Sequence, residues 1–466
     1  MVGASSSNAA RCAMTPPLSL SQWLSASRSD ETPIAWLGEQ TWTLGQLRYD
    51  VSILLDRLRQ QEADRWALCF ENSYLFIVAL LAVLYAGKTP VIPGHRRLSL
   101  LEEQRSLFSG VLSDAELCWR EGLLVVASAQ KSAPTKICLP AIADDASIEL
   151  FTSGSTGQPK RVVKRVAVLD YEARLLATRF SGQLDGCRVV ASVAPLHLYG
   201  LTFRIFLPMS QGLPLHAAMV HYAEQLAAFD RSYRYLFVSS PAFLKRLDPR
   251  LAAPSVSMIF SAGGMLPWKD VMATQAWLGV WPDEIYGCTE TGILAWRYRE
   301  QDDIPWQLFP GVRLTAEGDA FRAVSPLIAQ PDGQLLDDEL QFIGHGRFRL
   351  QGRRGRVVKI EEKRISLSEV ERRLMALDGI QDAAALPVVR RGRQGIGALL
   401  VLDRERQDAW REKHGNALEL SWRRALSPWL EPMAIPRYWR VVNEIPVNSM
   451  NKRVDTQLQE FFNDAP

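Results

Sequence analysis

A glycine- and hydroxyl-rich loop that ends in a lysine is the segment best suited to chemistry on phosphate. It reads Thr-Ser-Gly-Ser-Thr-Gly-Gln-Pro-Lys and covers residues 152–160. Glycines let successive backbone N–H groups point the same way and form a nest for an anion, while the hydroxyls and Lys160 add donors and positive charge. It is not a Walker A loop, because Arg161 follows the lysine where that motif has Ser or Thr. A flexible Ser/Gly turn is the alternative interpretation.

The residues on either side of this loop indicate how it is held. Residues 148–151 precede it, and residues 162–166 follow it with the alternation of a strand. We therefore expect the loop to join two antiparallel strands rather than to open a helix.

Four other stretches carry polar side chains in patterns with chemical meaning. His197 lies in Pro-Leu-His-Leu-Tyr-Gly at 195–200, and residues 286–292 read Tyr-Gly-Cys-Thr-Glu-Thr-Gly. Asp338 ends Leu-Asp-Asp ahead of a Gly-Arg pair at 352–353, and Lys452 ends Pro-Val-Asn-Ser-Met-Asn-Lys. Each of these stretches, taken alone, has an ordinary interpretation: a loop histidine with no role, a tight turn, a turn acid and a solvated lysine, respectively.

In this order, the five stretches resemble the motifs of the adenylate-forming superfamily. Its members are acyl- and aryl-CoA synthetases, the adenylation domains of peptide synthetases, and beetle luciferases. The resemblance covers nearly the whole chain. It implies ATP-dependent activation of a carboxylic acid to an acyl-adenylate, with release of pyrophosphate and later transfer of the acyl group to a thiol.

The resemblance also implies which residues bind the nucleotide. The phosphate loop would hold ATP through Thr152, Ser153, Gly154, Ser155, Thr156, Gly157 and Lys160. Tyr286 and Gly287 would lie at the adenine, and Glu290 with Thr156 would hold Mg²⁺, an ion that prefers oxygen ligands beside phosphates. Asp338 would accept hydrogen bonds from the ribose hydroxyls, and Arg353 would contact ribose or phosphate.

Three residues are implied in catalysis by the same resemblance. His197 would lie beside the substrate carboxylate, and Thr289 would meet the α-phosphate or the acid. Lys452 would bridge the carboxylate and the α-phosphate, which suits a point charge on a flexible stem. Both reactants are anions, so positive potential and positioning would lower the barrier, and no protein nucleophile is required.

Strand and helix patterns alternate from about residue 66. Strands are expected at 67–70, 188–193, 235–239 and 256–261, and helices at 73–86, 201–211, 241–247 and 268–278. Ser73 is the expected N-cap of the first helix. Such alternation predicts an α/β fold, with a large N-terminal domain of helix-covered mixed or parallel sheets.

The pattern changes after Gly352. A hairpin is expected at 357–360 and 363–365, then a capping box at 368–371 before a helix at 370–377. Strands at 383–389, 397–403 and 438–443 and a helix at 419–430 complete a small, mobile α+β domain. We expect a disordered N-terminus over 1–17, the adenylate-forming domain over 18–352, a hinge at 353–355 and a lid domain over 356–466.

Three positions depart from the family pattern. Gly355 replaces the acidic hinge residue, Asn451 replaces the glycine before Lys452, and Glu362 replaces a glycine in the loop that lines the pantetheine tunnel. Glu362 leaves open a nucleotide-binding relative with lost or altered thioesterification. A luciferase-like oxygenase is the other rival, and no separate motif marks it.

The substrate and the acceptor are constrained by two further observations. Leu198 occupies the place at which amino-acid-activating members have Asp, so we expect an acyl or aryl acid rather than an α-amino acid. The chain ends soon after Lys452, so we expect CoA or the phosphopantetheine of a separate acyl carrier protein as acceptor. The arginine run at 347–356, with Arg161, Lys164 and Arg165, could guide such a carrier or could be a solvated face.

Composition and charge indicate an ordinary soluble protein. The formal net charge of +3 over 466 residues gives no argument for nucleic-acid binding. No apolar run approaches the ~20 residues of a membrane span, and the N-terminus lacks a secretory pattern. The six cysteines are scattered without a C-x-x-C pair, which predicts a reducing, cytoplasmic location.

Overall fold

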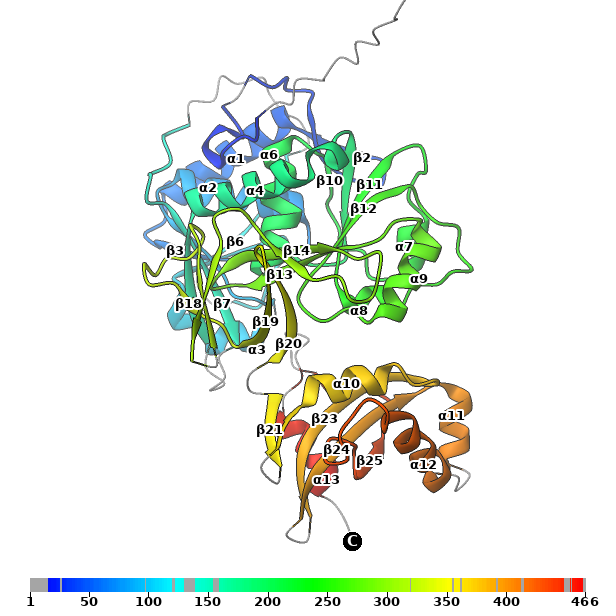
Figure 1. Cartoon of the computed structure of the whole chain (residues 1–466). Helices are drawn as coiled ribbons and strands as arrows, with labels where there is room; N and C mark the ends of the chain where they lie inside the picture. The colour runs from blue at the N-terminus through cyan, green and yellow to red at the C-terminus, as the bar shows by residue number, and fades with distance from the viewer. Residues whose placement is uncertain are drawn as a thin grey trace, which may run out of the picture.

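The computed structural model describes residues 16–463 except 26, 97, 120–121, 130–138, 154–158, 319, 354–355, 361–362, 391–392, 412–414, 448–452 and 454. Figure 1 shows a large N-terminal body and a smaller C-terminal body. Each body has hydrophobic clusters of its own. The architecture is the mixed α/β fold with a small α+β unit that the sequence predicts.

One sheet of the large body carries the phosphate loop. Its strands run in the order β6 (Leu123–Val125), β5 (Gly110–Ser113), β3 (Arg65–Cys69), β4 (Thr89–Ile92), β7 (Ser147–Ser153) and β8 (Pro159–Arg165). Neighbouring strands are parallel except for β7 and β8, which form an antiparallel hairpin around the loop. Helices in this part of the chain are α1 (Leu44–Arg59), α2 (Ser73–Tyr85) and α3 (Leu98–Glu103), with short turns η1 (Leu20–Gln22) and η2 (Arg105–Leu107).

The other large sheet carries the remaining motifs of the N-terminal body on its strands or directly after them. Its order is β19 (Asp338–Gly344), β20 (Arg347–Arg353), β15 (Trp306–Leu308), β14 (Gly292–Tyr298), β13 (Asp283–Cys288), β12 (Val256–Ser261), β11 (Arg234–Ser239), β9 (Cys187–Ala191), β10 (Leu215–His216), β1 (Pro33–Leu37) and β2 (Gln40–Thr43). Strands β9 to β13 run parallel, and the turn from β13 to β14 reverses the direction. Ligands of such sheets bind beyond the carboxyl ends of the parallel strands.

Helices and a small sheet complete this body. The helices are α4 (Val166–Leu184), α5 (Leu198–Gly200), the π-helix η3 (Leu201–Phe206), α6 (Leu207–Gln211), α7 (Ala223–Ala227), α8 (Pro241–Leu244) and α9 (Trp268–Leu278). The small sheet pairs β16 (Arg313–Glu317), β17 (Ala320–Val324) and β18 (Gln334–Leu335). Helix α8 is shorter than expected: it ends at Leu244 rather than at residue 247.

Helix α2 shows how the core sets an element that the sequence predicts. Every residue of α2 except Leu75 is buried, so packing rather than an amphipathic face holds it. The N-cap, however, is Asn72 and not Ser73. The Asn72 side chain accepts hydrogen bonds from the amides of Tyr74 and Leu75 at 2.9 and 3.2 Å, whereas Ser73 is the first, buried helical residue.

The C-terminal body is a sheet covered on both faces. The antiparallel hairpin β21 (Val357–Ile360) and β22 (Lys363–Ser366) leads to α10 (Leu367–Met375) and to the sheet β23 (Ile380–Arg390), β24 (Arg393–Leu402) and β25 (Tyr438–Val441). Helices α11 (Arg404–Ala409), α12 (Gly415–Leu426) and α13 (Asp455–Asn463) surround it. Alternate β23 residues enter different cores: Ala383 and Ala385 face Trp422, whereas Ala384 and Leu386 face Phe462.

Several boundaries in this body differ from the sequence prediction. Strands β23 and β24 begin at Ile380 and Arg393 rather than at residues 383 and 397. The N-cap of α10 is Ser366, whose hydroxyl accepts from the Glu369 amide at 3.2 Å, so the helix starts before the expected Ser368 cap. The signature Ser-x-x-Glu occurs twice, at 366–369 and at 368–371, and the helix uses the earlier serine. Helix α12 spans 415–426 rather than 419–430, since the following segment turns at Ser427.

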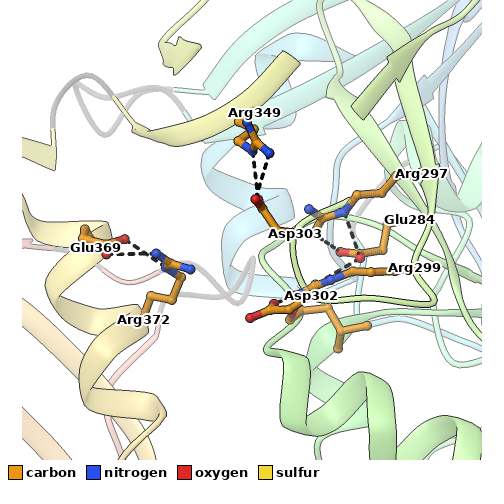
Figure 2. A network of polar contacts seen from close by, with 9 residues as sticks. Glu284, Arg297, Arg299, Asp302, Asp303, Arg349, Glu369 and Arg372 are labelled. Atoms are coloured by element: carbon orange, nitrogen blue, oxygen red, sulfur yellow. Dashed lines mark hydrogen bonds and ion pairs between the residues drawn. The ribbon is translucent and has the colours of Figure 1, made fainter. Parts of the chain in front are cut away.

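Polar contacts join the two bodies. Lys269 of α9 donates to the carbonyl of Ile380 at 3.0 Å, and Lys245 lies 3.5 Å from Asp382. Figure 2 shows Arg372 of α10 on the side of the C-terminal body that faces Asp302 and Asp303. The pKa of Arg372 is raised, mainly by its hydrogen bonds to Glu369 and further by these two aspartates.

In the described part of the chain, no helix combines the length and the apolar character that crossing a membrane requires. The division of the chain at 353–355 stays a prediction, because residues 354 and 355 lie outside the described residues. Strands β20 and β21, on either side of it, belong to different sheets.

Candidate active site

The phosphate loop joins β7 to β8, as the alternation predicted. Thr152 pairs with Lys160 and Ser153 with Pro159 across the antiparallel hairpin. The connecting residues Gly154, Ser155, Thr156 and Gly157 lie outside the described residues, so their predicted phosphate contacts stay predictions. Thr152 is half-buried and Lys160 is exposed.

His197 lies beside the strand that leads into this loop. A Cβ built on Gly94 would be 3.0 Å from the carbonyl oxygen of Phe151 and 3.5 Å from Cε1 of His197. Phe151 immediately precedes Thr152, so the histidine of the acid motif and the first residue of the phosphate loop share one neighbourhood.

Aromatic side chains lie behind His197. The hydroxyl of Tyr199 donates to the carbonyl of Ser239 at 2.9 Å, and the rings of Tyr199 and Phe203 are 4.8 Å apart. Phe203 in turn contacts Phe260 at 4.8 Å between ring centroids. Burial raises the pKa of Tyr199 well above its ordinary value, so this phenol stays neutral and serves as a hydrogen-bond donor.

The glycine of the acid motif is required by backbone contact. A Cβ on Gly200 would lie 1.9 Å from the carbonyl oxygen of Ala194. We expect Gly200→Ala to lower the free energy of unfolding by at least about 2 kcal/mol, because backbone atoms must move. Chemical denaturation of the full chain measures this. Gly182→Ala in α4, where a Cβ meets nothing within 4 Å, is the matched control and should stabilise by up to about 1 kcal/mol. Equal stability of the two variants would contradict the close approach.

The turn between β13 and β14 presents the predicted metal ligand. A Cβ on Gly287 would lie 2.1 Å from the carbonyl oxygen of Gly292, so the turn needs glycine there. The hydroxyl of Thr291 accepts from the Cys288 amide at 3.1 Å and donates to the Gly292 carbonyl at 2.8 Å. Thr289 and Glu290 form the tip of this turn and are half-buried.

Glu290 meets the phosphate-loop hairpin through its side chain. Lys160 Nζ lies 2.7 Å from Glu290 Oε1, although 130 residues separate them. Burial acts to raise the pKa of the Glu290 carboxyl, but hydrogen bonds from Lys160 and the backbone outweigh it and lower that pKa. The hydrogen bond with Glu290 raises the pKa of Lys160. Both groups are therefore charged at neutral pH.

Tyr286 and Asp338 form a second contact between distant motifs. The Tyr286 hydroxyl donates to Asp338 Oδ2 at 2.7 Å. The Tyr286 ring is 5.7 Å from the rings of both Trp306 and Phe348. Asp338 on β19 is the register partner of Arg353 on β20, so the backbone brings the predicted ribose-binding residues to one place.

Residues 92–315 match the family described as AMP-binding enzyme. These residues form an AMP-binding domain, as the motifs of the adenylate-forming superfamily predict. A 4-coumarate–CoA ligase of Halorhodospira halophila is 29% identical over 314 residues, which cover 65% of this chain and 73% of that protein. The nonribosomal peptide synthetase 8 of Aspergillus fumigatus is 28% identical over 308 residues, 59% of this chain but only 3% of that much longer protein.

The fold of this chain is also that of a solved structure. The crystal structure of ATP-bound MatB from Rhodopseudomonas palustris superposes with a TM-score of 0.79, at 18% identity, over 95% of this chain and 98% of that one. The family and the fold predicted from the motifs are thus confirmed.

The predicted carrier-guiding role of the basic side chains is wrong for Lys164. Its side chain is buried, and its ammonium donates to the carbonyls of Glu290 and Leu327 at 2.9 and 3.2 Å. Arg161 contacts the buried Glu149, which also holds Arg65. Arg349 in the arginine run pairs with Asp303 at 2.8 Å (Figure 2). These three cations are thus held within the protein, Lys164 by backbone carbonyls and the two arginines by carboxylates.

Lys452 lies outside the described residues, so its predicted role stays a prediction. Arg453, the next residue, contacts Asp382 and the carbonyl of Ala383, and lies 3.6 Å from Glu371. Among the described residues, no group of three or more His, Cys, Asp and Glu could hold a metal ion. A single ionised carboxylate at Glu290 fits Mg²⁺ held mainly by substrate phosphates and water.

Two buried polar residues were missed by the sequence interpretation. Lys164 appears in a basic strand, and Glu172 stands in a mostly apolar helical segment. The signal that could have drawn attention to them is the spacing of Lys160 and Lys164, which places both on the same face of β8.

Proposed function

We propose that this protein uses ATP to convert a carboxylic acid into an acyl-adenylate and then transfers the acyl group to a thiol. The carboxylate oxygen attacks the α-phosphorus of ATP and pyrophosphate leaves. In the second step the thiol sulfur attacks the acyl carbonyl, the thiol proton is lost, and AMP leaves. The acid is an acyl or aryl acid without an α-amino group.

The observation that carries this proposal is the contact between Lys160 and Glu290. It joins the phosphate-loop hairpin to the turn after β13, so a cation for phosphate and a carboxylate for a divalent ion meet at one point. Tyr286 and Asp338 provide an aromatic ring and a hydrogen-bond acceptor for a nucleoside nearby in the same sheet. Anion, metal and nucleoside sites that converge in this way are what adenylation of an acid requires.

Individual roles follow from this arrangement and are part of the proposal. Lys160 and the loop would hold the phosphates, and Glu290 would hold Mg²⁺, which would supply positive charge beside them. Thr289 lies next to Glu290 and would contact the α-phosphate, while His197 would lie beside the carboxylate. The buried Leu198 offers no carboxylate to a substrate amine. Residues 353–355 would be the hinge about which the small body rotates to bring Lys452 in and then to admit CoA or a carrier phosphopantetheine.

The test is acid-dependent exchange of pyrophosphate into ATP over a panel of short, medium, branched and aryl acids. We expect at least one acid to support exchange, and a thioester to form when CoA or a phosphopantetheine-bearing carrier protein is added. Binding of nucleotide without exchange by any acid would favour a relative that has lost turnover. Exchange without a thioester would point to Glu362, and light or product formation that requires O₂ would indicate an oxygenase.

A further inference from the structure

Lys164 and Glu172 are oppositely charged, nearly inaccessible side chains for which the proposed chemistry has no direct use. Their exposed fractions are 4% and 2%. Lys164 lies on β8, four residues after Lys160 and on the same face of that strand. Glu172 lies on α4, which follows β8 directly. Both therefore extend from the phosphate-loop hairpin and the helix that continues it.

The two charged groups contact the backbone of the turn that carries Glu290 at two different residues. Lys164 Nζ donates to the Glu290 carbonyl at 2.9 Å, and Glu172 Oε1 accepts from the Ile293 amide at 2.7 Å. A cation on a carbonyl and a carboxylate on an amide are the strong, charge-assisted arrangements. The backbone of residues 290–293 is thus fixed from both directions.

Glu172 also reaches the acid motif. Its second oxygen, Oε2, accepts from the hydroxyl of Thr202 at 2.7 Å. Thr202 lies in η3, which continues the helix begun at Leu198 in the acid motif. One carboxylate therefore connects the turn after β13 with the helix that follows His197.

Folding stability alone does not explain why Lys164 and Glu172 are charged. Burial raises the pKa of Glu172 and lowers that of Lys164, and each charge partly offsets this effect on the other. Buried charges of this kind are often replaced by apolar side chains without loss of stability. The desolvation cost of these two charges is explained if they are needed to fix the position of the turn at 288–293 for ligand binding.

We propose that Lys164 and Glu172 are positioning residues that fix the turn at 288–293, and with it the Glu290 carboxylate, for ATP bound with a divalent cation. This inference rests on the proposed function. It assigns to Lys164 the contact with the Glu290 backbone, while Lys160 contacts the side chain of the same residue.

The test compares two ligands in the full chain by calorimetric titration. Adenosine, which has no phosphate, reports the nucleoside site at Tyr286 and Asp338, whereas ATP with Mg²⁺ also depends on the turn that carries Thr289 and Glu290. We expect Lys164→Met and Glu172→Gln each to weaken binding of ATP with Mg²⁺ by about 10-fold or more, with adenosine affinity changed by less than about 2-fold. Glu172→Gln keeps an oxygen that can accept from the Ile293 amide, so its defect should be the smaller one.

The matched control is Lys88→Met. The Lys88 ammonium also donates to two backbone carbonyls, those of Gln61 and Ala63, at 2.9 and 2.6 Å, but on the edge away from the site. This variant should lower the unfolding temperature and leave both affinities unchanged. If Lys164→Met behaves like it, losing stability without a difference between the ligands, the positioning role is refuted.

The double variant Lys164→Met/Glu172→Gln covers the case in which a single uncompensated charge prevents folding. It removes both buried charges, so it should fold, and it should still bind ATP with Mg²⁺ about 10-fold or more weakly with adenosine affinity retained. Unaltered binding of ATP with Mg²⁺ by the double variant overturns the inference. Failure of the unmodified protein to bind either ligand would instead overturn the proposed function and remove its basis.

Discussion

Replacement of Lys452 by alanine is expected to slow acid-dependent pyrophosphate exchange by about 100-fold or more, a loss typical of removing one group that stabilises transition-state charge. Binding of ATP should change by less than about 3-fold, because the predicted role of Lys452 is confined to the moment when two anions meet. Exchange rates with the best acid of the panel, and calorimetric affinity for ATP, measure the two quantities.

A separate assay of the second step sharpens this prediction. Acyl-adenylate supplied directly should be converted to thioester by Lys452→Ala at close to the normal rate, because the proposed rotation would withdraw the lysine before that step. Lys452→Arg should restore little exchange, since a planar guanidinium does not replace a compact ammonium. Normal exchange in Lys452→Ala would contradict the assignment, and equal loss of both steps would indicate a folding defect.

Asp338→Ala should have the next largest effect, a loss of about 100-fold in affinity for both AMP and ATP. The carboxylate accepts from the Tyr286 hydroxyl at 2.7 Å, and its proposed hydrogen bonds to ribose would each be worth about 1.5–3 kcal/mol as bonds to a charged group. Titration calorimetry with AMP measures the loss, and AMP keeps the readout independent of the unidentified acid.

The neighbour Asp337 provides the control for this register. Of the family's Thr-Gly-Asp only the acid is retained, so Asp337 is the competing candidate. Its side chain is exposed, and Asp337→Ala should alter AMP affinity by less than about 3-fold. A larger loss of AMP affinity in Asp337→Ala than in Asp338→Ala would contradict the assignment of the ribose to Asp338. Tyr286→Phe should cost less than Asp338→Ala, and the double variant less than the sum, because the two share one contact.

The parts of the site that could be predicted are those that depend on short, contiguous stretches of sequence. The loop at 152–160 lies between two strands whose alternation is visible in the sequence, and the hairpin β7–β8 has the expected direction. Likewise β12 and α9 have the expected bounds, because short apolar runs and helical periods between turns leave few alternatives.

The parts that could not be predicted depend on partners far away in the chain. In the sequence Lys164 lies in a basic strand of the kind that is usually solvated. Only in the folded chain do the carbonyls of Glu290 and Leu327 accept hydrogen bonds from its buried ammonium. The caps at Asn72 and Ser366 differ from the predicted Ser73 and Ser368, because neighbouring polar residues compete for the same helix end. Element ends are therefore less certain than element types.

Asp382 links the position of Arg453 to the orientation of the C-terminal body relative to the N-terminal body. Its carboxylate holds Arg453, the neighbour of Lys452, and also approaches Lys245 of the N-terminal body. Ion pairs that are this accessible are worth about 1 kcal/mol or less, so this contact favours the orientation of the bodies only weakly. Because coupling between two such equilibria is reciprocal, a ligand that shifted Arg453 would also bias that orientation, and raising ionic strength would weaken both contacts of Asp382.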